Sequence, residues 1–217
     1  MIFNKLIDGD SANAIVFYPC WGCSAKLLRK LYSKMFKKQT CIFYDYPYSI
    51  LNSNPAETKQ NILDVVRDSI EILGEYKSVN LFGASLGSFI ALKVASLEPK
   101  TKKIMLITAG ENLAETVWLG YATKKLRKAM EEDGMSLSKL KEEWQELEPD
   151  FSQIKRKMIF LLQSKKDHTI LQDNRMRLLE KLANDNLIVE RHCSFNHTLT
   201  VFIGMLRFRM IYKFLRD

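Results

Sequence analysis

Three residues of this chain have the types and the spacing to carry out acyl transfer together. Ser85 lies within Gly83-Ala84-Ser85-Leu86-Gly87, between a short apolar run and an apolar helical pattern. Small residues two positions before and after a serine let a strand turn sharply into a helix and expose the hydroxyl at the turn. Asp167 lies in SKKDHT and His197 in SFNHT. We expect Ser85 to act as a nucleophile, His197 as its base and Asp167 as the acid that orients the base.

The other histidines and nearby acids fit these roles less well. His168 is adjacent to Asp167 and should point away when the aspartate faces the site. His192 falls at the end of a predicted strand, where a structural role is more common. Asp173 is an alternative acid, whereas Asp45 follows an earlier strand and suits the fixing of a loop.

Acyl transfer also needs two backbone N–H groups directed at the developing negative charge. The residue after the nucleophile, Leu86, supplies one of them. The turn after the first predicted strand, Pro19-Cys20-Trp21-Gly22, stands where the second is needed. We expect Trp21 to provide this N–H group and Gly22 to permit the tight turn.

Cys20 and Cys23 have the C-x-x-C spacing of thioredoxin-like redox pairs, which is a competing interpretation. A metal site that adds His192 and Cys193 is possible by ligand type, but its spacing matches no recognised zinc module. Neither interpretation accounts for the serine turn or for the spaced aspartate and histidine. We therefore expect reduced thiols and no metal.

Apolar runs of strand length alternate along the chain with amphipathic helical patterns, which predicts a parallel sheet covered on both faces. Predicted strands cover 14–18, 40–44, 79–82, 103–108, 158–163 and 187–191. Predicted helices follow them, including a last helix over 201–215. The expected fold is therefore a three-layer α/β/α domain of about six strands, formed by residues 1–217 as a single domain.

The alternation stops between the fourth and fifth predicted strands. Residues 110–150 show two helical stretches, 113–132 and 136–147, and no strand. We expect this segment to be a helical lid inserted over the carboxyl ends of the strands. Its aromatic residues are candidates to bind substrate; they are Trp118, Tyr121 and Trp144.

The composition bounds the remaining possibilities. With 217 residues, 47% hydrophobic and 27% charged, the chain reads as a globular protein with one core. It has neither an apolar run long enough to span a membrane nor a signal-peptide pattern, so we expect a cytoplasmic protein. The net charge of +8 is spread over helix faces and accompanies no nucleic-acid motif. It mildly favours an anionic partner such as an acyl carrier.

The serine turn, the acid loop and the histidine loop, in this order, resemble the α/β-hydrolase fold, in its serine esterase, lipase and thioesterase branch. The resemblance covers nearly the whole chain. Pro19-Cys20 replaces the usual His-Gly before the oxyanion residue, somewhat as in the compact pimeloyl-ester esterases, which keep a Trp-Gly here. Only residues 1–10 precede the first core strand, so the first two antiparallel strands of larger members are expected to be missing.

The resemblance implies a serine hydrolase without a cofactor. We expect it to cleave a carboxylic ester of a small to medium apolar acyl group. A thioesterase that acts on coenzyme A or carrier-protein thioesters is the alternative within the same chemistry. A redox protein, or a binding protein without catalysis, is the alternative of another class.

Overall fold

The structure, a computed structural model, describes residues 3–183 and 185–216. Its centre is a seven-stranded sheet in the order β1-β3-β2-β4-β5-β6-β7, in which all neighbours pair in parallel except β1 and β3. The strands are β1 (Asn4–Asp8), β2 (Asn13–Tyr18), β3 (Thr40–Asp45), β4 (Ser78–Ala84), β5 (Thr101–Ile107), β6 (Met158–Lys166) and β7 (Leu187–Asn196). The predicted three-layer α/β class is confirmed.

The sheet has seven strands where about six were expected, because one of the two antiparallel strands expected to be missing is present. Residues Asn4–Asp8 form an antiparallel strand at the edge of the sheet, where they pair with β3. This segment contains only half-buried and exposed residues, and its Lys5 forms an ion pair with Asp68 at 2.7 Å. A short edge strand with polar side chains lacks the continuous apolar run by which central parallel strands are found.

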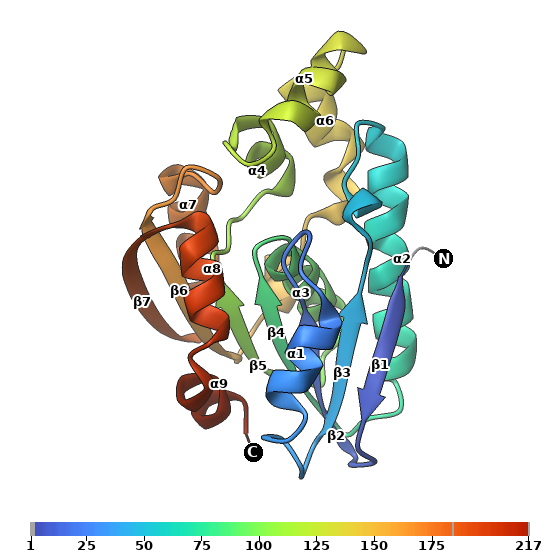
Figure 1. Ribbon diagram of the computed structural model, residues 1–217, viewed down its shortest axis with the longest axis vertical. Helices are drawn as coiled ribbons and strands as arrows, with labels where there is room; N and C mark the ends of the chain where they lie inside the picture. The colour runs from blue at the N-terminus through green and yellow to red at the C-terminus, as the bar shows by residue number, and fades with distance from the viewer. Residues whose placement is uncertain (1–2, 184, 217) are drawn as a thin grey trace.

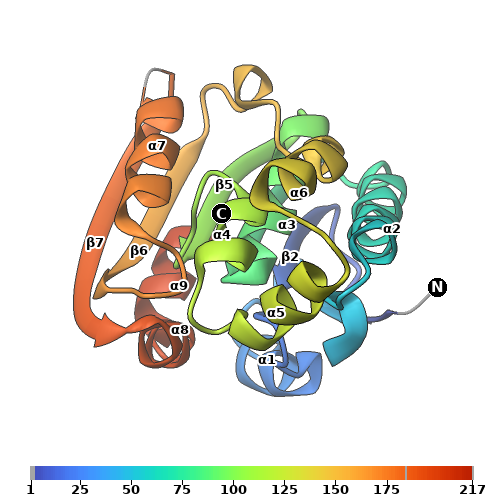
Figure 2. The same ribbon diagram turned by 90° about the horizontal axis from the view of Figure 1, so that it is seen from above.

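Helices cover both faces of the sheet (Figures 1 and 2). Alternate residues of β2 show how the faces divide: Val16 and Tyr18 belong to one core cluster, and Ile15 and Phe17 to the other. The first cluster includes residues of α2 (Pro55–Leu73), α3 (Leu86–Leu97) and α7 (Gln172–Ala183). The second includes residues of α1 (Ala25–Tyr32), α8 (His197–Met205) and α9 (Phe208–Leu215).

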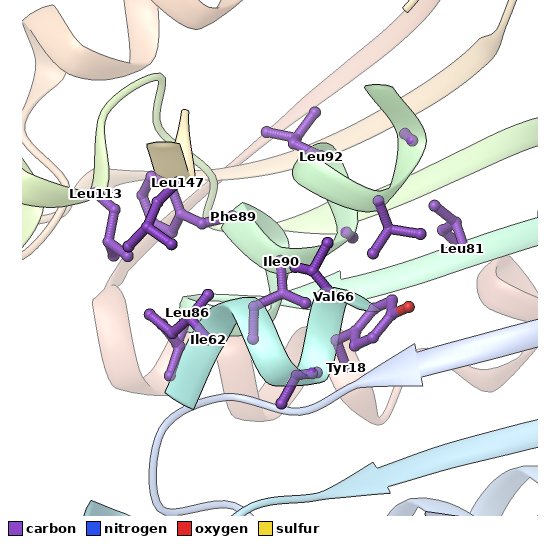
Figure 3. Close-up of a cluster of buried hydrophobic side chains, with 14 of the residues drawn as sticks. Tyr18, Ile62, Val66, Leu81, Leu86, Phe89, Ile90, Leu92, Leu113 and Leu147 are labelled. Carbon is purple, nitrogen blue, oxygen red and sulfur yellow. The ribbon is translucent and has the colours of Figure 1, made fainter. Parts of the chain in front are cut away.

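The helix α3 after the serine turn is buried on nearly every side. Figure 3 shows its Leu86 and Ile90 beside Ile62 and Val66 of α2, in the larger core cluster. Because an all-round apolar helix cannot face water, its place in the middle of the layer is fixed by packing. The residue at its start, Ser85, is thereby held at a rigid point.

The segment 110–150 lies beyond the carboxyl ends of the central strands (Figure 1). It contains α4 (Leu113–Leu119), α5 (Lys124–Glu132), α6 (Leu137–Glu143) and the 3₁₀ turn Gln145–Leu147. The expected helix over 113–132 is interrupted at Gly120, so it forms two helices. Further 3₁₀ turns lie at Tyr48–Ile50 and Phe151–Gln153.

The predicted helix over 201–215 also proves to be two helices. It begins earlier, at His197, and Leu206 and Arg207 separate α8 from α9. This division matters for the site, because it puts His197 in the first turn of a helix rather than in a loop. Across residues 3–183 and 185–216, no helix is both long and apolar enough to cross a membrane.

Candidate active site

Ser85 occupies a sharp turn between β4 and α3, with φ 51° and ψ −116°. Few residues other than glycine adopt a positive φ, and such conformations concentrate at functional sites. The turn also requires the glycines around it. A Cβ atom on Gly87 would meet the carbonyl oxygen of Tyr18, and one on Gly83 would meet Gly87. The glycines of the sequence motif are therefore required, because a side chain at either position would clash with the backbone of the turn that presents Ser85.

The structure brings Ser85, His197 and Asp167 into one hydrogen-bonded row. Ser85 Oγ lies 2.8 Å from His197 Nε2, and His197 Nδ1 lies 2.8 Å from Asp167 Oδ2. Because a carboxylate only accepts hydrogen bonds, the network assigns the imidazole proton to Nδ1, which leaves Nε2 free to accept from the serine hydroxyl. This is the arrangement in which a histidine can take a proton from serine.

The loop after β6 holds the carboxylate of Asp167 in place. Its Oδ1 accepts hydrogen bonds from the backbone N–H groups of Thr169 and Ile170, both at 2.8 Å. The Asp167 side chain has no exposed surface, and that of His197 is 12% exposed. The two carboxylate oxygens thus differ in role, since Oδ1 fixes the loop and Oδ2 orients the imidazole.

His197 owes its position to the boundary between β7 and α8. Asn196 is the last residue of the strand and caps the helix, since its side chain accepts from Leu199 N at 2.9 Å. The strand extends to Asn196, beyond the predicted end at Arg191. Sequence reasoning missed this helix cap, although an asparagine before an apolar helical pattern is its usual signal.

The turn after β2 lies beside the serine. Tyr46 donates a hydrogen bond to the carbonyl of Pro19, and Trp21 Nε1 donates to Tyr48 O at 2.6 Å. The Trp21 and Tyr48 rings stack with centroids 4.2 Å apart. Burial raises the pKa of Tyr46 well above its usual range, so this phenol keeps the proton with which it holds Pro19. The turn predicted to supply the second oxyanion N–H group is thus anchored at both ends.

Cys20 and Cys23 are joined by a disulfide bond, so the expectation of reduced thiols is wrong for this pair. A hydrogen bond of 3.0 Å from Cys23 N to Cys20 O closes the turn and brings the two Cα atoms to 5.2 Å, a usual separation for a disulfide. The cysteines Cys41 and Cys193 are free and buried. Within the described ranges, no group of three His, Cys, Asp or Glu residues is placed to hold a metal ion.

A cavity of about 240 Å³ opens beside Ser85. Its walls come from the turn after β2, from the start of α3, from the length of α8, and from α4 and the loop after it. They are mainly apolar, and they include Cys20, Trp21, Leu86, Phe89, Leu113, Thr116, Val117, Val201, Phe202 and Met205. An apolar cavity that meets a few polar groups at one end is typical of a site for a small organic ligand.

The three aromatic residues predicted to bind substrate are not among the described residues that line this cavity. Trp144 is 1% exposed, packs in the core and donates its indole N–H to Pro55 O at 2.9 Å. Tyr121 is 78% exposed, and Trp118 is half-buried against the core. That assignment is therefore corrected: the segment contributes Leu113 and Val117 to the wall instead.

The alternative acids and bases lie elsewhere. His168 is exposed, and His192 lies 3.3 Å from Glu190. Asp45 accepts from the N–H of Ala25 at 3.0 Å, which is the loop-fixing role expected of it. Asp173 is exposed on α7.

Comparisons with known proteins give results only at the level of structure. The sequence matches no known family profile and no curated protein. The fold is similar to that of a lipase-esterase related protein from Clostridium acetobutylicum, with 17% identity, TM-score 0.59, and coverage of 99% of this chain and 100% of that one.

Two further solved structures are similar. An esterase from Pyrococcus furiosus has 13% identity and TM-score 0.64, and the match covers 98% of this chain and 91% of that one. A monoacylglycerol lipase from Paleococcus ferrophilus has 16% identity and TM-score 0.58, with coverage of 99% and 98%.

Proposed function

The chain has the α/β-hydrolase fold, and on that premise we propose that it is a serine hydrolase that cleaves carboxylic esters of small to medium apolar acyl groups. The observation that carries the proposal is the row of two 2.8 Å contacts from Ser85 through His197 to Asp167. Names of structural neighbours such as esterase and lipase support ester hydrolysis in general.

The proposed reaction begins when Ser85 Oγ attacks the acyl carbonyl carbon while His197 Nε2 takes the hydroxyl proton. The N–H groups of Leu86 and Trp21 hold the oxyanion of the tetrahedral intermediate. Leu86 opens α3, so its N–H lacks a partner within the helix, and the positive end of the helix dipole favours negative charge there.

The leaving alcohol departs with the proton from His197, and an acyl-serine ester remains. Water then attacks this ester with the same base, which releases the acid and restores the hydroxyl of Ser85. Asp167 keeps the imidazole in the required tautomer throughout. These steps need only groups of this chain and water.

The acyl group is proposed to enter the apolar cavity, with residues 110–150 acting as its lid within a single domain of residues 1–217. Leu113 and Val117 from this segment support the idea, since both line the cavity with Ser85. Because its volume of about 240 Å³ is modest, a short or medium acyl chain fits better than a long one.

A thioester of coenzyme A or of an acyl carrier protein is the second candidate substrate. The observation that favours it is the net charge of +8, which suits an anionic carrier.

The cytoplasmic location of the protein stays a prediction. The Cys20–Cys23 disulfide weighs against it, because disulfides persist mainly in oxidising compartments.

The test is turnover of p-nitrophenyl esters and of acyl thioesters, each graded from acetyl to octanoyl, by the wild type and by Ser85→Ala. We expect ester turnover by the wild type and a loss of about 10⁴-fold or more in kcat for the variant. A fluorophosphonate probe should label the wild type at Ser85. Ester hydrolysis that Ser85→Ala leaves unchanged would rule out the mechanism, and faster turnover of thioesters would favour the second candidate.

A further inference from the structure

The disulfide Cys20–Cys23 lies in the turn that carries Trp21, and the proposed reaction makes no use of it. We propose that it is a thiol–disulfide exchange site: thiols that enter the cavity reduce it, and its reduction lowers turnover at Ser85. The second half of this inference rests on the proposed function.

The position of the pair makes it reachable. Both cysteines line the cavity that also holds Ser85. Cys20 is 8% exposed, whereas Cys23 is half-buried and follows the exposed Gly22. An attacking thiolate therefore reaches Cys23 first.

The two free cysteines do not offer a competing site. Cys41 is 1% exposed and Cys193 5% exposed, and both pack in the core on one face of the sheet. Burial, with a smaller contribution from Asp8, raises the pKa of the Cys41 thiol to about 12, so it stays protonated and unreactive.

The exchange is a two-step reaction with a dithiol reductant. A thiolate of the reductant attacks Cys23 Sγ, the bond between the two cysteines breaks, and Cys20 leaves as a thiolate that takes up a proton. The second thiol of the reductant then attacks the reductant's own sulfur in the mixed disulfide and releases Cys23 as a thiol. Two cysteine thiols and one oxidised reductant result, so atoms and electrons balance.

The turn couples reduction of the disulfide to the position of the proposed oxyanion N–H group. Pro19 is held by Tyr46 before the turn, and Ala25 is held by Asp45 after it. Between these anchors, the disulfide closes a ring around Trp21. Reduction removes this covalent constraint, so the backbone that carries the Trp21 N–H group is free to shift within the turn.

Reduction of the disulfide should lower kcat rather than raise KM. The N–H group of Trp21 serves a charge that exists only in the transition state, so its displacement removes no binding energy from the substrate itself. The Trp21 ring remains tied to Tyr48 by its hydrogen bond and by stacking, so the wall of the cavity is kept. KM should therefore change little.

The experiment compares three proteins on one p-nitrophenyl ester: the wild type, the double variant Cys20→Ser/Cys23→Ser and the control Cys41→Ala/Cys193→Ala. Each is measured oxidised, and again after reduction with dithiothreitol and desalting without oxygen. Mass spectrometry after alkylation counts the free thiols in each. We expect reduction to lower kcat about 10-fold or more, up to the 10²–10³-fold that follows loss of an oxyanion donor. The control should show the same response, and the double variant should be slow in both states.

The outcomes separate this inference from the proposed function. If turnover depends on Ser85 but is equal or faster when two further thiols are counted, only the inference fails. It also fails if the air-oxidised protein contains four free thiols. If no ester is hydrolysed in either redox state, the proposed function fails and the effect on turnover fails with it.

Discussion

The carboxylate of Asp167 has two hydrogen-bonding roles that differ by oxygen atom. Its Oδ1 accepts from Thr169 and Ile170, and its Oδ2 faces His197 Nδ1. A substitution that keeps the first role and alters the second would therefore separate loop stability from catalysis.

Asp167→Asn makes this separation. The amide oxygen can still accept from the loop, but the amide nitrogen now donates to Nδ1 and forces the imidazole proton onto Nε2, which then cannot accept from Ser85. We expect kcat to fall by about 10⁴-fold, with little change in the unfolding midpoint. Steady-state kinetics and urea unfolding measure the two effects.

Asp173→Asn is the matched control, because this aspartate is exposed on α7. Its kcat should equal that of the wild type. An Asp167→Asn variant with more than a tenth of wild-type kcat would show that another group orients His197.

At the scale of elements, the segment 110–150 is tied to α7 by charge. Glu111 contacts Arg177 at 2.8 Å and Lys181 at 2.6 Å, and Glu115 contacts both Arg177 and Lys141. Partial burial would raise the pKa of Glu111, but the hydrogen bonds and charges of Arg177 and Lys181 outweigh it, and its pKa lies below the usual value. The carboxylate therefore favours the folded state only when it is ionised.

Glu111→Gln should make this contribution visible as a function of pH. Because the folded pKa lies below the unfolded value of about 4.3, the stabilisation is complete above that pH and is lost as the pH falls through the folded pKa. We expect the variant to be less stable by about 1 kcal/mol at pH 7, and this difference to shrink as the pH falls towards 3.

Urea unfolding at the two pH values measures the difference. Glu131→Gln is the control, since Glu131 is half exposed and lies 3.6 Å from Arg127; it should change stability less at pH 7. A loss for Glu111→Gln of the same size at both pH values would contradict the ionic origin.

The helix α4 also provides a test of the acyl cavity. Val117 is 1% exposed and lines the wall, so Val117→Phe places a ring in the space proposed for the acyl chain. We expect kcat/KM for the octanoyl ester to fall roughly tenfold or more, while the acetyl ester changes less than about threefold. The p-nitrophenyl ester series measures this.

Tyr121→Ala is the control, because Tyr121 is 78% exposed and lies off the cavity. Its chain-length profile should match that of the wild type. If Tyr121→Ala shifts the profile and Val117→Phe does not, the acyl chain binds outside the cavity described above.

At the scale of the whole molecule, the sequence was sufficient to predict those features of the fold and the site that depend on local residue patterns. Strand-length apolar runs, the glycines around Ser85 and the order of Asp167 and His197 were sufficient for the α/β class and for a candidate triad. Three parallel strands that end at one edge of a sheet bring their following loops together, whatever their distance along the chain.

What the sequence did not predict depends on contacts between distant segments. The apolar spacing indicates that Trp118 and Trp144 point away from solvent, but it does not show whether they pack in the core or line a cavity. The short strand Asn4–Asp8 is defined only by its partner β3. The C-x-x-C spacing fits reduced thiols and a disulfide equally, so the state of Cys20 and Cys23 follows from the geometry of the turn.

The three residues of the candidate triad differ in how well the fold protects them against local unfolding. Ser85 follows a strand with neighbours on both sides, whereas His197 follows β7, which is the last strand of the sheet and pairs with β6 alone. Side chains along β7 are partly open to solvent, with Leu187 63% and Val189 42% exposed. Segments of this kind detach at lower free energy than a central strand. Local opening of the sheet is therefore expected to move His197 before it moves Ser85, which the central strand β4 and the buried helix α3 hold in place.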